Sequence, residues 1–215
     1  MLLECSGLLF DMDGVLLDSR DIVERTWRRW AALHGRPAEP FLAVASGRRS
    51  RDTLRLVAPE LATDEEVAWL DSAELLDFEG IRPIPGVMTL LNGLPPAAWT
   101  VVTSASREIA SGRLGAIGLA LPANAVTSEA VTRGKPAPDG YLLGAERLGL
   151  APGACLVVED SPAGIAAGAA AGARVLGLTT THTAAEVAAA DMIAADLRSV
   201  RVTPGPRGLE IAIRP

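Results

Sequence analysis

"LLFDMDGVLLDS", residues 8–19, ends an apolar run with two carboxylates, Asp11 and Asp13, two positions apart. Carboxylates this close repel each other, and their burial costs free energy unless a cation compensates for it. The stretch therefore predicts either a cation site at the end of a buried strand or a harmless exposed turn. An EF-hand calcium loop does not fit, because Gly14 comes too early and Ile22 stands where the closing Glu belongs.

Outside this stretch, short apolar segments alternate with amphipathic ones. The strand-like segments are 7–11, 99–103, 154–159 and 173–178, and the helical segments lie near 86–94, 106–117, 138–149 and 161–171. Apolar strands joined by helices are typical of a parallel sheet covered on both faces. We therefore predict an α/β fold with a doubly wound, Rossmann-like parallel-sheet core. Two alternating segments around a Pro/Gly-rich turn at 200–213 predict a β-hairpin on the edge of this sheet.

The early part of the chain departs from this rhythm. Residues 16–82 contain amphipathic helical stretches without a convincing strand between them. Tryptophans recur on their apolar faces, a pattern that more often reflects core packing than a ligand site (Trp27, Trp30, Trp69). We predict an all-helical cap domain at 16–82, inserted into an α/β core made of residues 1–15 and 83–215.

The composition is that of an ordinary globular chain. It has 215 residues, 49% hydrophobic and 21% charged, with a formal net charge of -6. The acidic balance and the lack of a basic patch argue against nucleic acid as a partner, and the strand-sized apolar runs argue against a membrane span. We expect a cytoplasmic protein, because the first residues lack the basic start and cleavage site of a signal peptide. A monomer is the default expectation.

Three residue types narrow the chemistry further. Cys5 and Cys155 lie in strand-like segments without a neighbouring His, which favours buried structural thiols over a disulfide. His34 and His182 lie far from the acidic motifs, so a zinc site is not expected. Lys135 is the only lysine among 20 basic residues. It is either a chance survivor in an arginine-rich chain or a sign that this position needs a compact ammonium.

Polar clusters follow or lie near the ends of the predicted strands, where doubly wound sheets bind their ligands. They are Asp11 with Asp13, 101–106, 132–141 and 157–164. Two carboxylates from the first cluster, together with Glu159 and Asp160 from the last, could form an oxygen cage for a hard cation, Mg²⁺ above all. Backbone N–H groups near Thr103, Ser104 and Ser161, where helices begin, could hold phosphate oxygens, and a lysine opposite the metal would balance their charge.

Four stretches also carry a strong resemblance to a known family. "DMDGVLLDS" (11–19), "VVTSAS" (101–106), "GKPAPDGYLLGAERLG" (134–149) and "VVEDSPAGIAAGAAAGA" (157–173) resemble, in order, the four motifs of haloacid dehalogenase-like (HAD) phosphohydrolases. The resemblance covers nearly the whole chain. A helical insert just after the first motif is similar to the C1-capped subgroup, which includes sugar and polyol phosphatases and β-phosphoglucomutase.

The resemblance implies a role for each matched residue. Asp11 would be the nucleophile that forms an aspartyl-phosphate. Asp13 would be the general acid and base, with its backbone carbonyl on the metal. Lys135 would clamp the phosphate, which accounts for the lone lysine. Asp160 would bind Mg²⁺ directly, and Glu159 directly or through water.

Two groups of contacts are less sharply implied. Either Thr103 or Ser104 would hold the phosphate beside Ala105, since both residue types occur at this motif in relatives. From the cap, Arg48 or Arg49 would reach the substrate or merely solvate a helix. Relatives often carry His where Ser46 stands here, and this departure leaves the exact substrate undetermined by the resemblance.

These implications predict a Mg²⁺-dependent phosphatase of small phosphorylated sugars or polyols. Two alternatives stay open: a β-phosphoglucomutase-like mutase, which the same residues could serve, and a non-catalytic binding module. The intact acidic residues and Lys135 oppose loss of chemistry. A phosphonatase fits poorly, because the cap has no lysine for a Schiff base. A dehalogenase also fits poorly, because it has no use for Asp13.

Overall fold

The computed structural model describes residues 2–205 and 208–213. In chain order, with η for 3₁₀-helices, its elements are β1 (Leu2–Cys5), β2 (Gly7–Phe10), β3 (Leu17–Asp18), α1 (Arg20–Leu33), α2 (Glu39–Ala45), α3 (Ser50–Val57), η1 (Pro59–Leu61), α4 (Asp64–Leu75), β4 (Arg82–Pro83), α5 (Val87–Asn92), η2 (Pro96–Ala98), β5 (Trp99–Val101), α6 (Arg107–Ala116), η3 (Ser128–Ala130), α7 (Asp139–Arg147), η4 (Pro152–Ala154), β6 (Cys155–Glu159), α8 (Pro162–Ala170), β7 (Arg174–Leu178), β8 (Met192–Ala194), η5 (Leu197–Ser199), β9 (Val200–Gly205) and β10 (Gly208–Ile213).

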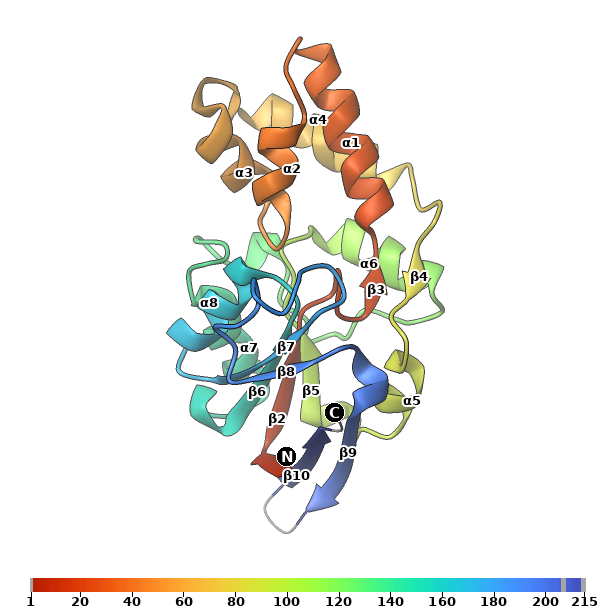
Figure 1. The fold of residues 1–215 in the computed structure, drawn as a ribbon, viewed down its shortest axis with the longest axis vertical. Helices are drawn as coiled ribbons and strands as arrows, with labels where there is room; N and C mark the ends of the chain where they lie inside the picture. Colours follow the sequence, from red (N-terminus) through yellow and green to blue (C-terminus); the bar gives the residue numbers. More distant parts are fainter. Residues whose placement is uncertain (1, 206–207, 214–215) are drawn as a thin grey trace.

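A parallel sheet forms the centre of the molecule (Figure 1). Its strands lie in the order β5-β2-β6-β7-β8, with every neighbouring pair parallel. The four strands predicted from the sequence are confirmed, because each is an apolar run that is buried almost throughout. The edge strand β8 was not predicted, since it is only three residues long and its middle residue, Ile193, is exposed.

Helices cover both faces of this sheet. Leu8 and Phe10 of β2 point into one apolar cluster, which includes Leu90 of α5 and Leu114 of α6. The residue between them points the other way, into a second cluster with α7 and α8. Because successive strand residues face opposite sides, a strand that is apolar at every position is buried on both faces. The predicted doubly wound α/β core is confirmed.

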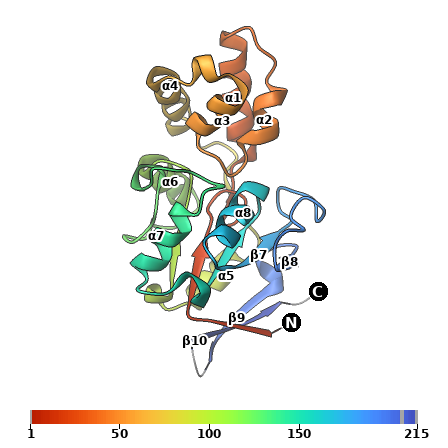
Figure 2. The same ribbon diagram turned by 90° about the vertical axis from the view of Figure 1, so that its left-hand side faces the viewer.

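Helices α1–α4, which we call the cap, stand above the carboxyl ends of the sheet strands (Figure 2). They enclose an apolar cluster of their own. The rings of Trp27 and Phe41 stack with centroids 5.4 Å apart, and Trp30 meets Phe41 edge-on at 5.1 Å. Trp69 is half-buried and lies under the guanidinium of Arg29. The prediction that these tryptophans pack in a core is confirmed, and 16–82 stays our proposed extent of the cap domain.

The connection between cap and core contains two short strands that the sequence did not predict. β3 and β4 pair antiparallel, with Leu17 opposite Pro83 and Asp18 opposite Arg82. No strand lies between the helical stretches, as expected, but these two short strands stand at the two ends of the segment 16–82 that was predicted to be all-helical. Two residues are too few to produce an alternating pattern, so their pairing becomes visible only when the chain returns to the core.

The carboxy-terminal hairpin exists, but its predicted place on the edge of the main sheet is wrong. β9 and β10 pair antiparallel, and β10 also pairs with β1, which gives a separate sheet of order β1-β10-β9 at the end of the molecule opposite the cap (Figure 1). Leu209 and Ile211 point inward and join the core cluster, and this burial fixes the register. The turn residues 206–207 lie outside the described residues.

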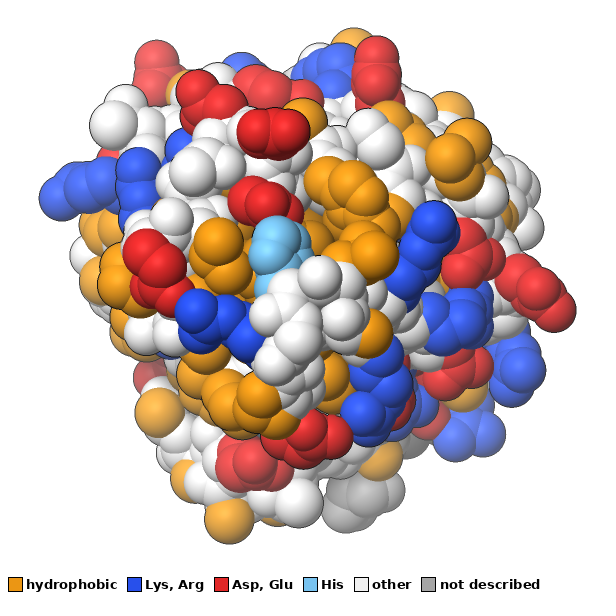
Figure 3. All heavy atoms as spheres, turned by 90° about the horizontal axis from the view of Figure 1, so that it is seen from above, with side chains coloured by type: hydrophobic (Ala, Val, Ile, Leu, Met, Phe, Trp, Pro, Cys, Tyr) orange, Lys and Arg blue, Asp and Glu red, His pale blue; other side chains and the backbone are white. Residues whose placement is uncertain are grey.

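Other expectations concern the surface and the thiols. In the described part of the chain, none of the helices has the length and apolar character needed to cross a bilayer. Acidic and basic side chains are interspersed on the face seen from above the cap (Figure 3). Cys5 and Cys155 are free and buried, which confirms the prediction of structural thiols.

Candidate active site

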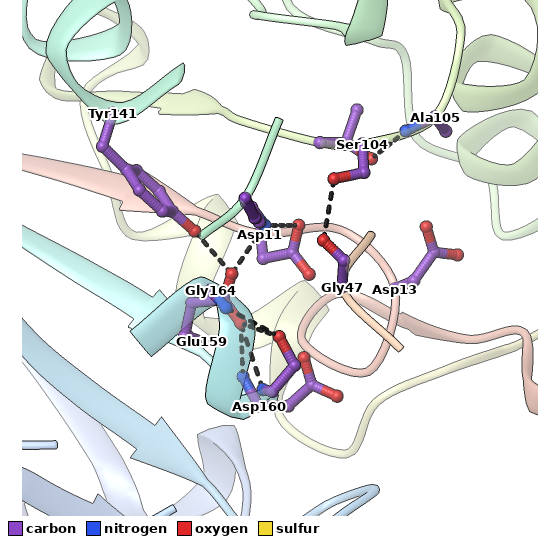
Figure 4. Close-up of polar contacts among 12 residues, drawn as sticks. Asp11, Asp13, Gly47, Ser104, Ala105, Tyr141, Glu159, Asp160 and Gly164 are labelled. Carbon is purple, nitrogen blue, oxygen red and sulfur yellow. Dashed lines mark hydrogen bonds and ion pairs between the residues drawn. The ribbon is translucent and has the colours of Figure 1, made fainter. Parts of the chain in front are cut away.

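The carboxyl ends of β2 and β6 bring three buried carboxylates together (Figure 4). Oxygens of Asp11, Glu159 and Asp160 lie within 4.8 Å of one another. One Asp160 oxygen, Oδ2, accepts a hydrogen bond from the Thr181 hydroxyl on the loop after β7. The other, Oδ1, is buried without a hydrogen-bond partner among the described residues. Such an orphaned carboxylate oxygen is costly unless a ligand completes it.

Gly14 allows these carboxylates to approach. Its φ of 80° lies in the left-handed region that favours glycine. A Cβ at this position would overlap the carboxylate of Asp160. The turn after β2 can therefore pass close beside Asp160 only with glycine at this position.

Lys135 supplies a buried cation to the cluster. Its Nζ lies 2.6 Å from Asp11 Oδ1 and 2.6 Å from Glu159 Oε1, and the side chain is 6% exposed. Burial acts to lower the pKa of Lys135, but the two carboxylates outweigh it, so the pKa lies above its ordinary value. These carboxylates therefore favour the charged ammonium, which lies directly against Asp11.

Glu159 holds this arrangement in place. Its Oε1 accepts from Lys135 Nζ and from the Tyr141 hydroxyl at 2.7 Å. Its Oε2 accepts from the backbone N–H groups of Asp160 and Ser161 and from the Ser161 hydroxyl. Burial acts to raise the pKa of Glu159, but Lys135 and these hydrogen bonds bring it below its ordinary value. With both oxygens engaged, Glu159 orients Lys135, and direct ligation of a metal by Glu159 stays a prediction.

The other two carboxylates, Asp11 and Asp160, have pKa values above their ordinary range. Burial raises the pKa of Asp11 to about 7, although Lys135 partly offsets the shift. Burial and the neighbouring Glu159 raise the pKa of Asp160 well above its ordinary value. A divalent cation between them would stabilise both charged forms and engage the orphaned Asp160 oxygen. Because every donor is an oxygen, the residues fit a hard cation such as Mg²⁺.

Asp13 points away from this cluster, toward the base of the cap (Figure 4). Its Oδ1 accepts hydrogen bonds from Ser19 Oγ at 2.5 Å and from Arg113 Nη1 at 2.7 Å. Arg113 also pairs with Glu74 of α4 at 2.9 Å. The sequence analysis did not predict that Arg113 and Glu74 belong to the site. A signal existed, because Arg113 falls on the buried face of α6 between the apolar residues 109, 110 and 114.

The predicted phosphate-binding segment lies after β5. Thr103 is buried, and its Oγ1 accepts from the backbone N–H of Ala105 at 3.1 Å, which shapes the turn. Ser104 Oγ donates to the carbonyl of Gly47 in the cap at 2.8 Å. Thr103, Ser104 and Ala105 all line the cleft between cap and core, so either Thr103 or Ser104 could be the residue that holds the phosphate.

A cleft of about 680 Å³ separates the cap from the carboxyl ends of the strands. Asp11, Asp13 and Asp160 line its floor, and Arg48 and Arg49 line its cap side. Arg48 Nη1 donates to the Lys135 carbonyl at 3.4 Å. Arg49 pairs with Asp52 at 2.6 Å and donates to carbonyls of the loop before Lys135. The cap arginines thus reach the core, and their contact with a substrate stays a prediction.

Comparison with known proteins assigns the chain to a family. Residues 5–172 match the model of the haloacid dehalogenase-like hydrolases. The chain belongs to this family. The resemblance of the four motifs is thereby confirmed, and the family's hydrolase chemistry agrees with a cleft floored by carboxylates.

The similar proteins include phosphatases. The chain is 41% identical over 211 residues to hexitol phosphatase A of Escherichia coli, covering 96% of this chain and 98% of that protein. It is 34% identical over 193 residues to glycerol-1-phosphate phosphohydrolase 2 of Saccharomyces cerevisiae, covering 83% and 76%. A crystal structure of β-phosphoglucomutase from Clostridium difficile shares the fold, with a TM-score of 0.75 and 19% identity over 92% of this chain and 93% of that one.

Proposed function

We propose that this chain is a Mg²⁺-dependent phosphatase of small phosphorylated polyols and sugars, with hexitol phosphates as the first class to test. One observation carries the proposal: Asp11 lies on the floor of the cleft against the buried Lys135, beside the unpartnered oxygen of Asp160. This arrangement offers a nucleophile, a fixed cation and an open oxygen ligand at one point. The similarity to hexitol phosphatase A supports the substrate class.

In the first step, an Asp11 oxygen would attack phosphorus and the bond from phosphorus to the substrate oxygen would break. The products are an aspartyl-phosphate and the free alcohol. Asp11 is suited to this because Lys135 occupies only its Oδ1, which leaves Oδ2 for attack. A covalent step splits one difficult displacement into two easier ones.

Asp13 would move the protons. It would protonate the departing alkoxide in the first step and take a proton from water in the second. Water then breaks the bond between phosphorus and the Asp11 oxygen, and inorganic phosphate leaves. The side chain of Asp13 is 29% exposed and lines the cleft, so it can reach both the leaving oxygen and the incoming water.

Asp11 and Asp160, with the Asp13 carbonyl, would hold Mg²⁺, and the ion when bound would supply positive charge to the transferring phosphoryl group. Lys135 would add a second positive charge through its contact with Asp11. The backbone of the 103–105 segment and the cap arginines provide further donors for phosphate oxygens.

The wall of the cleft suits a hydroxylated leaving group. Glu24 and Asp71 line it together with apolar residues such as Trp27 and Val67. Carboxylates accept hydrogen bonds from hydroxyl groups, and the apolar surface packs against a carbon chain.

Phosphate release tests the proposal. The panel contains sorbitol 6-phosphate, glycerol 1-phosphate, phosphoglycolate and glucose 1-phosphate, each assayed with Mg²⁺ and with EDTA. We expect Mg²⁺-dependent release, greatest with the polyol phosphates, and its loss in Asp11→Asn. The absence of release from the whole panel in Mg²⁺, by a folded protein, would overturn the proposed function.

A further inference from the structure

A buried arginine joins the proposed acid/base to the cap. The side chain of Arg113 on α6 is 3% exposed, although arginine is among the residues least often buried. Its two terminal nitrogens pair with carboxylates from different parts of the chain: Asp13 after β2 at 2.7 Å, and Glu74 on cap helix α4 at 2.9 Å. A buried guanidinium is tolerated only when it is paired in this way.

The contact restrains the carboxylate of Asp13. Arg113 Nη1 and Ser19 Oγ both donate to the same oxygen, Oδ1. The charge-assisted bond from Arg113 and the short bond from Ser19 together hold the carboxylate in a single orientation. They leave Oδ2 of Asp13 free to exchange a proton with the substrate. The rigid, planar guanidinium suits this task, since it can bond two carboxylates at fixed directions.

We propose that Arg113 is a positioning residue that orients Asp13 for proton transfer to the leaving alcohol, and that Glu74 ties this orientation to the cap. The inference rests on the proposed function, because it concerns a step of that reaction. Glu74 is itself buried and supplied by α4, so the second carboxylate of Arg113 is present only where α4 is seated on α6.

Leaving groups of different basicity separate positioning from a merely structural role. Departure of a hexitol oxygen needs a proton, whereas p-nitrophenolate leaves as an anion. Loss of a positioned acid should therefore lower kcat/KM for sorbitol 6-phosphate much more than for p-nitrophenyl phosphate. General damage to the fold would lower both by the same factor.

The variants are chosen around the buried charges. Arg113→Met removes the guanidinium and keeps much of its volume. Arg113→Lys keeps a cation that can bond one carboxylate well. Because Arg113→Met leaves Glu74 buried and unpaired, the double variant Arg113→Met with Glu74→Leu removes that charge too and protects the fold. Arg198→Met is the control for the loss of a paired arginine, since Arg198 pairs with Asp196 away from the cleft, on an exposed side chain.

With Mg²⁺, we expect Arg113→Met and the double variant to lose on the order of 100-fold in kcat/KM on sorbitol 6-phosphate and less than about threefold on p-nitrophenyl phosphate. Arg113→Lys should recover part of the loss, and Arg198→Met should match the wild type. Equal losses on both substrates, or no loss in a folded variant, would overturn the inference alone. Failure of the wild type on every polyol phosphate would overturn the proposed function and this inference with it.

Discussion

Lys135 and Asp11 form a buried ion pair, with Nζ 2.6 Å from Oδ1, and Asp11 lines the floor of the cleft. Lys135 is fixed at this position because its ammonium also bonds Glu159, which in turn is held by four further donors. The compact ammonium of Lys135 thus contacts two buried carboxylates at once, and the hydrogen bonds of Glu159 fix the position of one of them. The pair supports the interpretation that this position needs a compact ammonium, which the only lysine of the chain supplies.

The first prediction concerns this lysine. Lys135→Arg should lower kcat/KM on a polyol phosphate by at least about 100-fold, because a planar fork cannot replace a compact ammonium between two buried carboxylates. Steady-state phosphate release measures the loss, and circular dichroism checks the fold. Arg133→Lys, at an exposed ion pair two positions away, is the control and should keep wild-type activity. Full activity of Lys135→Arg would mean that this position does not require a lysine and that its occurrence here is a matter of chance.

The second prediction concerns the orphaned oxygen of Asp160. Mg²⁺ at about 100 times its Kd should stabilise the wild type by about 2.7 kcal/mol, which raises Tm by roughly 5–10 °C in a chain of this size. Asp160→Asn should abolish that response. In EDTA, the variant should melt no lower than the wild type, because burial makes the charge at this position unfavourable without a cation.

Asp64→Asn is the control for the metal experiment, since Asp64 is an almost fully exposed carboxylate outside the cleft. It should keep the wild-type response to Mg²⁺ in differential scanning fluorimetry. An undiminished response in Asp160→Asn would place the metal elsewhere.

The third prediction concerns the contact of a cap loop with the core. Gly47 has φ 74°, its carbonyl accepts from Ser104, and a Cβ would overlap the Ser161 hydroxyl. Gly47→Ala should therefore prevent this loop from seating and lower kcat/KM by roughly tenfold or more.

Gly35→Ala is the matched control for backbone strain. Gly35 has φ 61° but nothing within 4 Å of the added Cβ. It should lose stability by about 1–2 kcal/mol, the cost of a left-handed alanine, and keep its activity. Activity losses of equal size in the two variants would mean that strain, rather than the close approach to Ser161, causes the effect.

The fourth prediction concerns the thiols. Burial raises the pKa of Cys5 to about 11, although Arg174 partly offsets the shift, and burial also raises the pKa of Cys155. Both should be protonated and inaccessible at pH 8, so a thiol-specific reagent should label neither in the native protein and both after denaturation. Rapid labelling of the native protein would show that these strands open readily.

The fold could be predicted where local sequence carries the signal. Apolar runs such as 154–159 are buried on both faces of the sheet, so their pattern alone defines a strand. β8 and β1 escaped prediction because their existence depends on partners. β1 pairs with residues 209–212, about two hundred positions away, and no local pattern reports that pairing.

The site divides in the same way. Asp11, Asp13, Lys135 and Asp160 stand in contiguous motifs, and the topology of a parallel sheet brings such motifs to one edge. The link from Asp13 to Arg113 spans 100 positions, and that from Arg113 to Glu74 spans 39. It exists only because the cap folds back onto α6, so the motifs could not reveal it.

Chemical trapping of the covalent intermediate tests the central claim most directly. Wild-type protein is mixed with Mg²⁺ and sorbitol 6-phosphate, quenched within the first turnover, reduced with borohydride and mapped by mass spectrometry. The account predicts conversion of Asp11 to homoserine, and no conversion in Asp11→Asn or without substrate. Turnover without modification of Asp11, or modification of another carboxylate, would contradict it.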